Sequence, residues 1–198
     1  MKKDFIYLAS ASPRRRELLE QIRVPIRIQP ADLAEVPMAG ELPAAFAGRM
    51  AREKALAIWQ SMGPDPRPVL AADTVVVLDG HIFGKPTDTG DAEAMLAALS
   101  GATHQVFTSV AVVWEGDISE RLSVSKVRLR ATTAAERHAY AATGEPRDKA
   151  GGYGIQGRGA VFVEAIEGSY SGVVGLPLAE TCALLRPHGL PAWLEAQS

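Results

Sequence analysis

The sequence predicts an α/β fold in which a long mixed β-sheet is flanked by helices. Along the 198 residues, apolar stretches of strand length alternate with amphipathic stretches of helix length. Two tight turns, at Asp79-Gly80 and at Glu115-Gly116-Asp117, join neighbouring apolar stretches as hairpins. The sheet is therefore expected to contain antiparallel as well as parallel strands. The length, with no repeat or long linker, favours a single domain over residues 1–198.

The first half of the chain predicts three strands and two helices. Pro13 after Ser12 is typical of a helix start. Pro25 favours an edge position for its strand, because proline cannot donate a backbone hydrogen bond. In order, the expected elements are a strand at 5–9, a helix from Pro13 to about Ile22, an edge strand at 24–30, a helix at 44–61 and a strand at 69–78.

The second half predicts further strands, three helices and a glycine-rich loop. Alternating apolar and polar residues indicate long strands on both sides of the second hairpin turn. In order, the expected elements are a strand after Asp79-Gly80, a helix at 89–99, strands at 104–114 and 118–130, a helix capped by Thr133 and ending near Ala142, the loop 144–159, a strand at 160–166 and a helix at 176–186.

Composition excludes several classes of protein. There are 21 basic and 23 acidic side chains, a net charge of −2, which argues against a general nucleic-acid or membrane-surface binder. The short apolar stretch near the N-terminus is too short for a spanning helix. The one cysteine, Cys182, suits a reducing, cytoplasmic compartment and a packed position on a helix.

A basic helix start is the first candidate site. The segment Ser10-Ala11-Ser12-Pro13-Arg14-Arg15-Arg16 places three arginines at a helix N-terminus, where cations are unfavourable. Free N–H groups, hydroxyls and arginines together favour a phosphate site. The alternative is a solvated basic turn whose charges are offset by the nearby Glu17 and Glu20.

Asp73 is the second candidate. It lies inside the apolar run 69–78, where a carboxylate must be compensated by a metal, a cation or hydrogen-bond donors. Burial raises a carboxyl pKa, which suits a general base, whereas a divalent cation would lower it. The alternative is that the strand ends near residue 72 and leaves Asp73 exposed to water at the end of the strand.

Two lysines are further candidates. Lys54 is the one charged residue on the helix stripe formed with Phe46, Met50 and Ile58. Either it extends its head from the edge of the core into water, or it points into a pocket as a phosphate ligand. Lys85, after the first hairpin, is either exposed or a phosphate ligand.

The glycine-rich loop matches G-x-G-x-x-G over residues 152–157, but no strand precedes it and no helix follows, which excludes a dinucleotide fold. Its glycines allow close approach of backbone to a ligand, with the Gln156 amide facing a base edge. The alternative is a flexible turn. The four histidines lack metal-ligand spacing, and no nucleophile elbow or Walker A sequence occurs.

Four blocks together make the chain resemble the Maf-like nucleoside triphosphate pyrophosphatases, in their dTTP/UTP branch. They are LASASPRRRELL at 8–19, AREKA at 51–55, AADTVVVLDG with GKP at 71–86, and GEPRDKAGGYGIQGRGA through GSYSGVVGLPL at 144–178. The resemblance implies an ITPase-like fold with two lobes around a nucleotide cleft. It also implies hydrolysis between the α- and β-phosphates of a nucleoside triphosphate, giving the monophosphate and pyrophosphate.

The resemblance also implies residue roles. Asp73 is the expected proton acceptor, and Arg14, Thr74 and Gln156 are the expected specificity positions. The expected triphosphate ligands are Ser10, Ser12, Arg14, Arg15, Lys54 and Lys85. A divalent cation, Mg²⁺ or Mn²⁺, is expected on Asp73 and Glu35, although the acidic segment 31–35 is thinner here than is common in the family.

Cytoplasmic location and a homodimer are further implications of the resemblance. A donor-acceptor amide at Gln156 favours a pyrimidine, because it can pair with an imide edge. Two other functions stay open: a pyrophosphatase acting on a modified purine such as 7-methyl-GTP, and a non-catalytic nucleotide-binding regulator of cell division.

Overall fold

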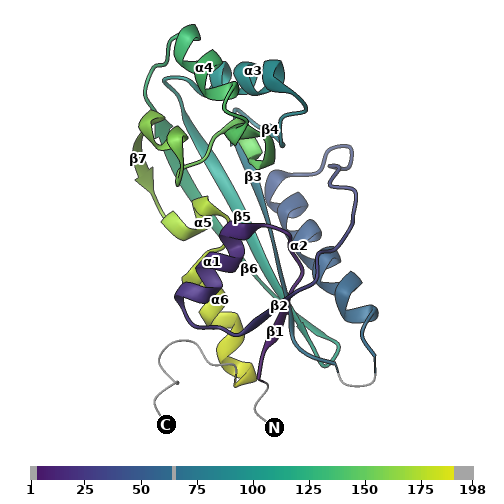
Figure 1. Ribbon diagram of the computed structural model, residues 1–198. Helices are drawn as coiled ribbons and strands as arrows, with labels where there is room; N and C mark the ends of the chain where they lie inside the picture. The colour runs from purple at the N-terminus through teal and green to yellow at the C-terminus, as the bar shows by residue number, and fades with distance from the viewer. Residues whose placement is uncertain (1–3, 64–65, 190–198) are drawn as a thin grey trace. The chain divides into compact units, whose positions relative to one another are not determined.

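The α/β fold with a mixed, helix-flanked sheet is confirmed by the structure. The computed structural model describes residues 4–63 and 66–189. Its sheet has the strand order β2-β1-β3-β5-β6-β7, with β4 paired to β3 (Figure 1). The strands are β1 (Ile6–Leu8), β2 (Ile26–Ile28), β3 (Val69–Leu78), β4 (His81–Phe83), β5 (Thr103–Trp114), β6 (Asp117–Leu129) and β7 (Val163–Glu167).

Six α-helices accompany the sheet within the described residues. They are α1 (Pro13–Gln21), α2 (Pro43–Gln60), α3 (Thr89–Leu99), α4 (Ala134–Ala141), α5 (Tyr170–Val174) and α6 (Leu178–Leu185). Among residues 4–63 and 66–189, no helix combines the length and the apolar character that a bilayer crossing requires. Short 3₁₀ turns occupy Glu145–Asp148, Ala150–Gly152, Arg158–Phe162 and Arg186–His188.

The chain divides into two compact units. The first contains Met1–Asp73, Thr108–Ser123 and Gly175–Ser198, and the second contains Thr74–Phe107 and Val124–Val174. Strands β3, β5 and β6 contribute residues to both units. A single domain over 1–198 stays a prediction.

In the first unit, β1 pairs in parallel with β2 and with β3. The short β2 ends the strand order, as Pro25 predicted, and is shorter than the predicted 24–30. Small and branched side chains fill the space between this part of the sheet and α2; they are Ala9, Ala55, Ile58, Val69, Ala71 and Val113. The small side chains of Ala55 on α2 and Ala71 on β3 let the helix lie close to the strand, so that polar side chains of the two elements can meet.

In the second unit, β3 and β4 form the predicted hairpin, with Asp79 and Gly80 at φ of 51° and 80°. Helix α4 begins with a capping box in which the Thr133 hydroxyl accepts from the Glu136 N–H, and α3 packs against α4 (Figure 1). Its core includes His104, which is buried with Nε2 2.7 Å from the Tyr153 hydroxyl. Burial lowers the pKa of His104 to about 4, so this imidazole is neutral at pH 7.

Near the C-terminus, two element boundaries differ from prediction and one helix was not predicted. The strand predicted at 160–166 begins at Val163, because residues 158–162 form a 3₁₀ turn. The helix predicted at 176–186 begins at Leu178, after Pro177 at its N-cap. Helix α5 was not predicted, since five residues that include Gly172 carry too little helical pattern.

Candidate active site

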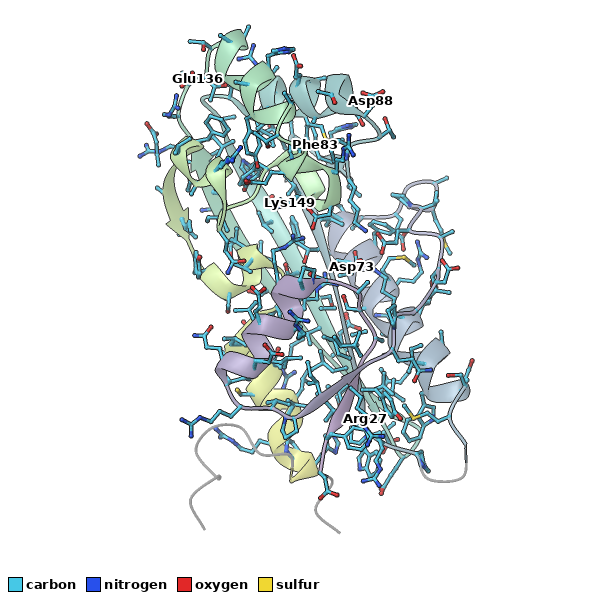
Figure 2. The ribbon with its side chains drawn as sticks, in the orientation of Figure 1. Arg27, Asp73, Phe83, Asp88, Glu136 and Lys149 are labelled. Carbon is cyan, nitrogen blue, oxygen red and sulfur yellow. The ribbon has the colours of Figure 1, made fainter. Side chains whose placement is uncertain are left out.

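Asp73 lies in the interior of β3, which continues to Leu78. The alternative that the strand ends at residue 72 and exposes this carboxylate is therefore wrong, because Asp73 is only 5% exposed. A buried carboxylate requires a compensating donor or cation. The compensation comes from α2, whose Lys54 Nζ donates to Asp73 Oδ1 at 2.6 Å (Figure 2 labels Asp73).

Lys54 is buried on the stripe that Phe46, Met50 and Ile58 also occupy. The interpretation that its head extends into water is wrong: the side chain is 7% exposed, and its ammonium also lies 2.5 Å from Glu35 Oε1. One ammonium thus faces two carboxylates, one buried and one 37% exposed. We call Glu35, Lys54 and Asp73 the carboxylate–lysine cluster.

The environment of Asp73 raises its pKa above the ordinary value. Burial is the largest cause, and Glu35 adds to it, whereas Lys54 and Arg15 oppose it by attraction. A carboxylate whose pKa is raised accepts a proton more readily than one in water does. The chemistry that this cluster offers is therefore proton acceptance beside fixed positive charge.

The serine–arginine turn lies at the start of α1 in the same unit. Arg15 donates through Nε to the Gly175 carbonyl at 2.8 Å and through Nη1 to Ser10 Oγ at 3.1 Å. Arginine stays protonated in proteins at neutral pH. Burial lowers the pKa of Arg15, whereas attraction to Asp73 and Glu35 opposes the change. This coupling indicates that Arg15 lies near enough to the carboxylate–lysine cluster to share its field.

The other residues of this turn differ in their roles. Ser12 occupies the N-cap position of α1, but its side chain makes no capping bond, and its N–H donates to Ser10 Oγ at 3.2 Å. Arg16 pairs with Glu20 at 3.6 Å on the surface, as the solvated alternative predicted for this turn. Arg14 is half-buried. The structure thus separates an inward Arg15 from an outward Arg16.

An ion pair that the sequence did not indicate, Arg49–Glu41, holds the segment that carries Glu35. Arg49, one turn before Glu53 on α2, donates to both carboxylate oxygens of Glu41 at 2.7 Å and to the Val36 carbonyl at 3.0 Å. Glu41 also accepts from the Met38 N–H at 2.9 Å. The bond with Arg49 lowers the pKa of Glu41 to about 2. Both residues resemble ordinary surface charges in sequence, so no local signal marked them.

The remaining predicted residues belong to the second unit. Thr74 follows Asp73 directly in β3. Lys85 and Gln156 are both exposed. The segments that carry them are connected by a hydrogen bond from the Gly151 N–H to the Gly84 carbonyl at 3.0 Å. The structure therefore brings Glu35, Lys54 and Asp73 of the first unit into direct contact.

The two carboxylate groups of the cluster are suitable ligands for a divalent cation. Residues 4–63 and 66–189 contain no group of three His, Cys, Asp or Glu side chains suited to holding a metal. Glu35 and Asp73 nevertheless direct oxygens at one cationic atom, Lys54 Nζ. Mg²⁺ commonly takes one or two carboxylates and completes its shell with substrate phosphates and water, so two carboxylates are a sufficient protein contribution.

Comparison with known proteins identifies the family. The family profile described as Maf-like protein matches residues 5–188. The chain belongs to the Maf family. A relative from Saccharophagus degradans, named dTTP/UTP pyrophosphatase, is 52% identical to this Maf chain over 190 residues, which cover 95% of the chain and 90% of the relative.

Two further Maf relatives carry the same name. Those of Alcanivorax borkumensis and Chromobacterium violaceum are each 52% identical, over 95% and 93% of this chain and 97% and 94% of their own lengths. Among solved structures, the Staphylococcus aureus Ham1 protein aligns with a TM-score of 0.43 and 14% identity, over 63% of this chain and 71% of its own.

Proposed function

We propose that this Maf chain hydrolyses dTTP and UTP to the nucleoside monophosphate and pyrophosphate. The observation that carries the proposal is the carboxylate–lysine cluster, in which a buried carboxylate with a raised pKa lies beside an ammonium. The printed name of relatives 52% identical over nearly the whole chain supports the choice of substrate.

Cationic and hydroxyl groups bind the triphosphate in this proposal. Phosphate oxygens accept hydrogen bonds from guanidinium, ammonium and hydroxyl donors, and charged donors form the stronger bonds. The Arg15 bonds to Gly175 and Ser10 hold its guanidinium in one orientation before substrate arrives. The proposed triphosphate ligands are Ser10, Ser12, Arg14, Arg15, Lys54 and Lys85.

Asp73 is the proposed general base. Its carboxylate takes a proton from a water molecule, whose oxygen attacks the α-phosphorus in line with the departing pyrophosphate. Lys54 and Arg15 supply fixed positive charge for the charge that develops on the phosphoryl oxygens. Asp73 acts in its ionised form, which Lys54 and Arg15 favour and burial disfavours.

A divalent cation, Mg²⁺ or Mn²⁺, would be held by Asp73 and Glu35. When bound, it would neutralise phosphate charge and polarise phosphoryl oxygens. The Arg49–Glu41 ion pair would hold Glu35 near Asp73 for that purpose, since Arg49 also donates to the carbonyl of the next residue, Val36.

Base selection is proposed for Gln156, Thr74 and Arg14. The Gln156 amide offers one donor and one acceptor, which complement the imide edge of thymine or uracil. Cytoplasmic location and a homodimer complete the proposal. No observation favours a 7-methyl-GTP substrate or a purely regulatory role over the pyrimidine activity.

A panel of nucleoside triphosphates tests the function. The full-length protein is incubated with dTTP, UTP, dCTP and 7-methyl-GTP in the presence of Mg²⁺ or Mn²⁺, and released pyrophosphate is measured. We expect dTTP and UTP to give kcat/KM values at least about tenfold above the other two, because a base edge that does not match the Gln156 amide leaves a hydrogen-bonding group without a partner in the complex. A preference for 7-methyl-GTP, or nucleotide-dependent thermal stabilisation without pyrophosphate release, would contradict the proposal.

A further inference from the structure

The glycine-rich segment of the second unit is built around one carboxylate, that of Glu145. Its Oε1 accepts hydrogen bonds from the Tyr140 hydroxyl at 2.9 Å and the Gly159 N–H at 3.1 Å. Its Oε2 accepts from the Arg158 N–H at 2.9 Å. Glu145 therefore ties the end of the segment to its beginning.

Tyr140 extends this connection to the other side of Gln156. Its hydroxyl accepts from the Gly154 N–H at 2.9 Å while it donates to Glu145. Backbone groups two residues before and two residues after Gln156 are thus anchored to the same carboxylate–phenol pair. The Gln156 side chain itself is exposed.

The glycines of this segment make the arrangement possible. A Cβ at Gly157 would collide with the Glu145 carboxylate, and one at Gly154 would meet the Lys149 side chain at 2.5 Å. At Gly159 it would lie 2.7 Å from the Tyr140 hydroxyl. The G-x-G-x-x-G spacing of residues 152–157 is therefore explained in part by the protein's own Glu145, against which the backbone packs (Figure 2 labels Lys149, which is part of this segment).

The Glu145 carboxylate is ionised at neutral pH. Burial raises its pKa, but hydrogen bonds from Arg158, Gly159 and Tyr140 outweigh burial, and the pKa is lower than usual. Its hydrogen bonds are consequently charge-assisted and stronger than bonds to a neutral acceptor.

We propose that Glu145 is a positioning residue for base selection, which holds the turn 154–159 so that the exposed Gln156 amide is presented in one orientation. The inference rests on the proposed function, because Gln156 selects a base only if a pyrimidine triphosphate is the substrate. Glu145 touches no reacting atom in this proposal, so its removal changes recognition more than chemistry.

Glu145→Gln tests the proposal with little change in volume. The amide keeps one oxygen acceptor and loses the charge, so at least one of the three bonds breaks. We expect kcat/KM for dTTP and UTP to fall about tenfold, mainly through KM, and the dTTP-to-dCTP ratio to fall with it. Tyr140→Phe, which frees the Gly154 N–H, is expected to act in the same direction. Amide hydrogen exchange at Gly154, Arg158 and Gly159 should accelerate in Glu145→Gln.

The matched control is Glu136→Gln on α4, in the same unit (Figure 2). Glu136 also accepts from backbone and side-chain donors, the Thr133 N–H at 2.8 Å and Arg130 Nη2 at 2.7 Å. It lies outside the Gln156 turn, so the dTTP-to-dCTP ratio should stay at the wild-type value.

The outcomes separate this inference from the proposed function. Equal losses for dTTP and dCTP in Glu145→Gln, or unchanged exchange at the three amides, would overturn the positioning role alone. A wild-type protein that releases no pyrophosphate from dTTP or UTP would overturn the proposed function and this inference with it. A lower ratio together with faster exchange supports both.

Discussion

Asp73→Asn is expected to lose pyrophosphate release from dTTP by at least about 100-fold, since a positioned general base contributes 10²–10⁴-fold. Asparagine retains the shape of aspartate and an oxygen that accepts from Lys54, whose ammonium also keeps Glu35 at 2.5 Å. The fold should therefore survive while proton acceptance is lost. The measurement is kcat from continuous pyrophosphate detection, accompanied by a thermal melt of the same samples.

Asp79→Asn provides the matched control. Asp79 lies in the exposed turn that ends β3 and has a φ of 51°, a conformation that asparagine also tolerates. It should keep the wild-type rate. If Asp73→Asn turned over dTTP as fast as this control, Asp73 would not be the base.

Lys54→Met is expected to destabilise the protein by about 3–5 kcal/mol at pH 7, the usual result of removing one partner from a buried ion pair. The side chains of Lys54 and Asp73 are only 7% and 8% exposed, so water screens the remaining charge poorly. Urea denaturation of Lys54→Met and of Lys54→Met/Asp73→Asn measures the effect. The double variant should recover part of the lost free energy of unfolding, because it no longer contains the buried Asp73 charge that Lys54→Met leaves without its cation.

The loss should also shrink as the pH falls. Lys54 lowers the pKa of Asp73, so its removal raises that pKa further, and protonation at acidic pH then relieves the uncompensated charge. Lys126→Met is the control, since Lys126 forms a pair with Glu167 whose side chains are 53% and 78% exposed. An exposed pair should cost at most about 1 kcal/mol. Equal losses at Lys54 and Lys126 would show that the buried pair does not hold the cluster together.

Much of the fold and of the cluster could be predicted from local pattern. The run 69–78 is apolar on both faces, which predicted a buried strand, although the pattern alone fits both a buried Asp73 and one exposed at the end of that strand. The spacing of Phe46, Met50 and Ile58 predicted that Lys54 lies on the buried stripe of α2. Asp73 and Lys54 were each identified from the local sequence pattern of the strand or helix that contains them.

The pairing of these elements could not be predicted in the same way. That Lys54 meets Asp73 depends on how α2 packs on β3, and this follows from alanines such as Ala55 and Ala71 that permit close approach. Arg49 and Glu41, and likewise Glu145, have the sequence character of solvated charges. Arg49 and Glu145 bind backbone groups 13 and 14 residues away in the chain, to which hydrophobic periodicity is insensitive, and Glu41 acts through Arg49.

Hydrolysis of dTTP in water enriched in ¹⁸O tests most directly whether water attacks the α-phosphorus. The attacking oxygen bonds to the phosphorus that it reaches, and the bond to the departing group breaks on the other side. Mass spectrometry of both products, with dTMP and pyrophosphate incubated separately in the same water as exchange controls, locates the label. We expect one ¹⁸O in dTMP and none in pyrophosphate; label in pyrophosphate would mean attack at the β-phosphorus and would contradict the mechanism.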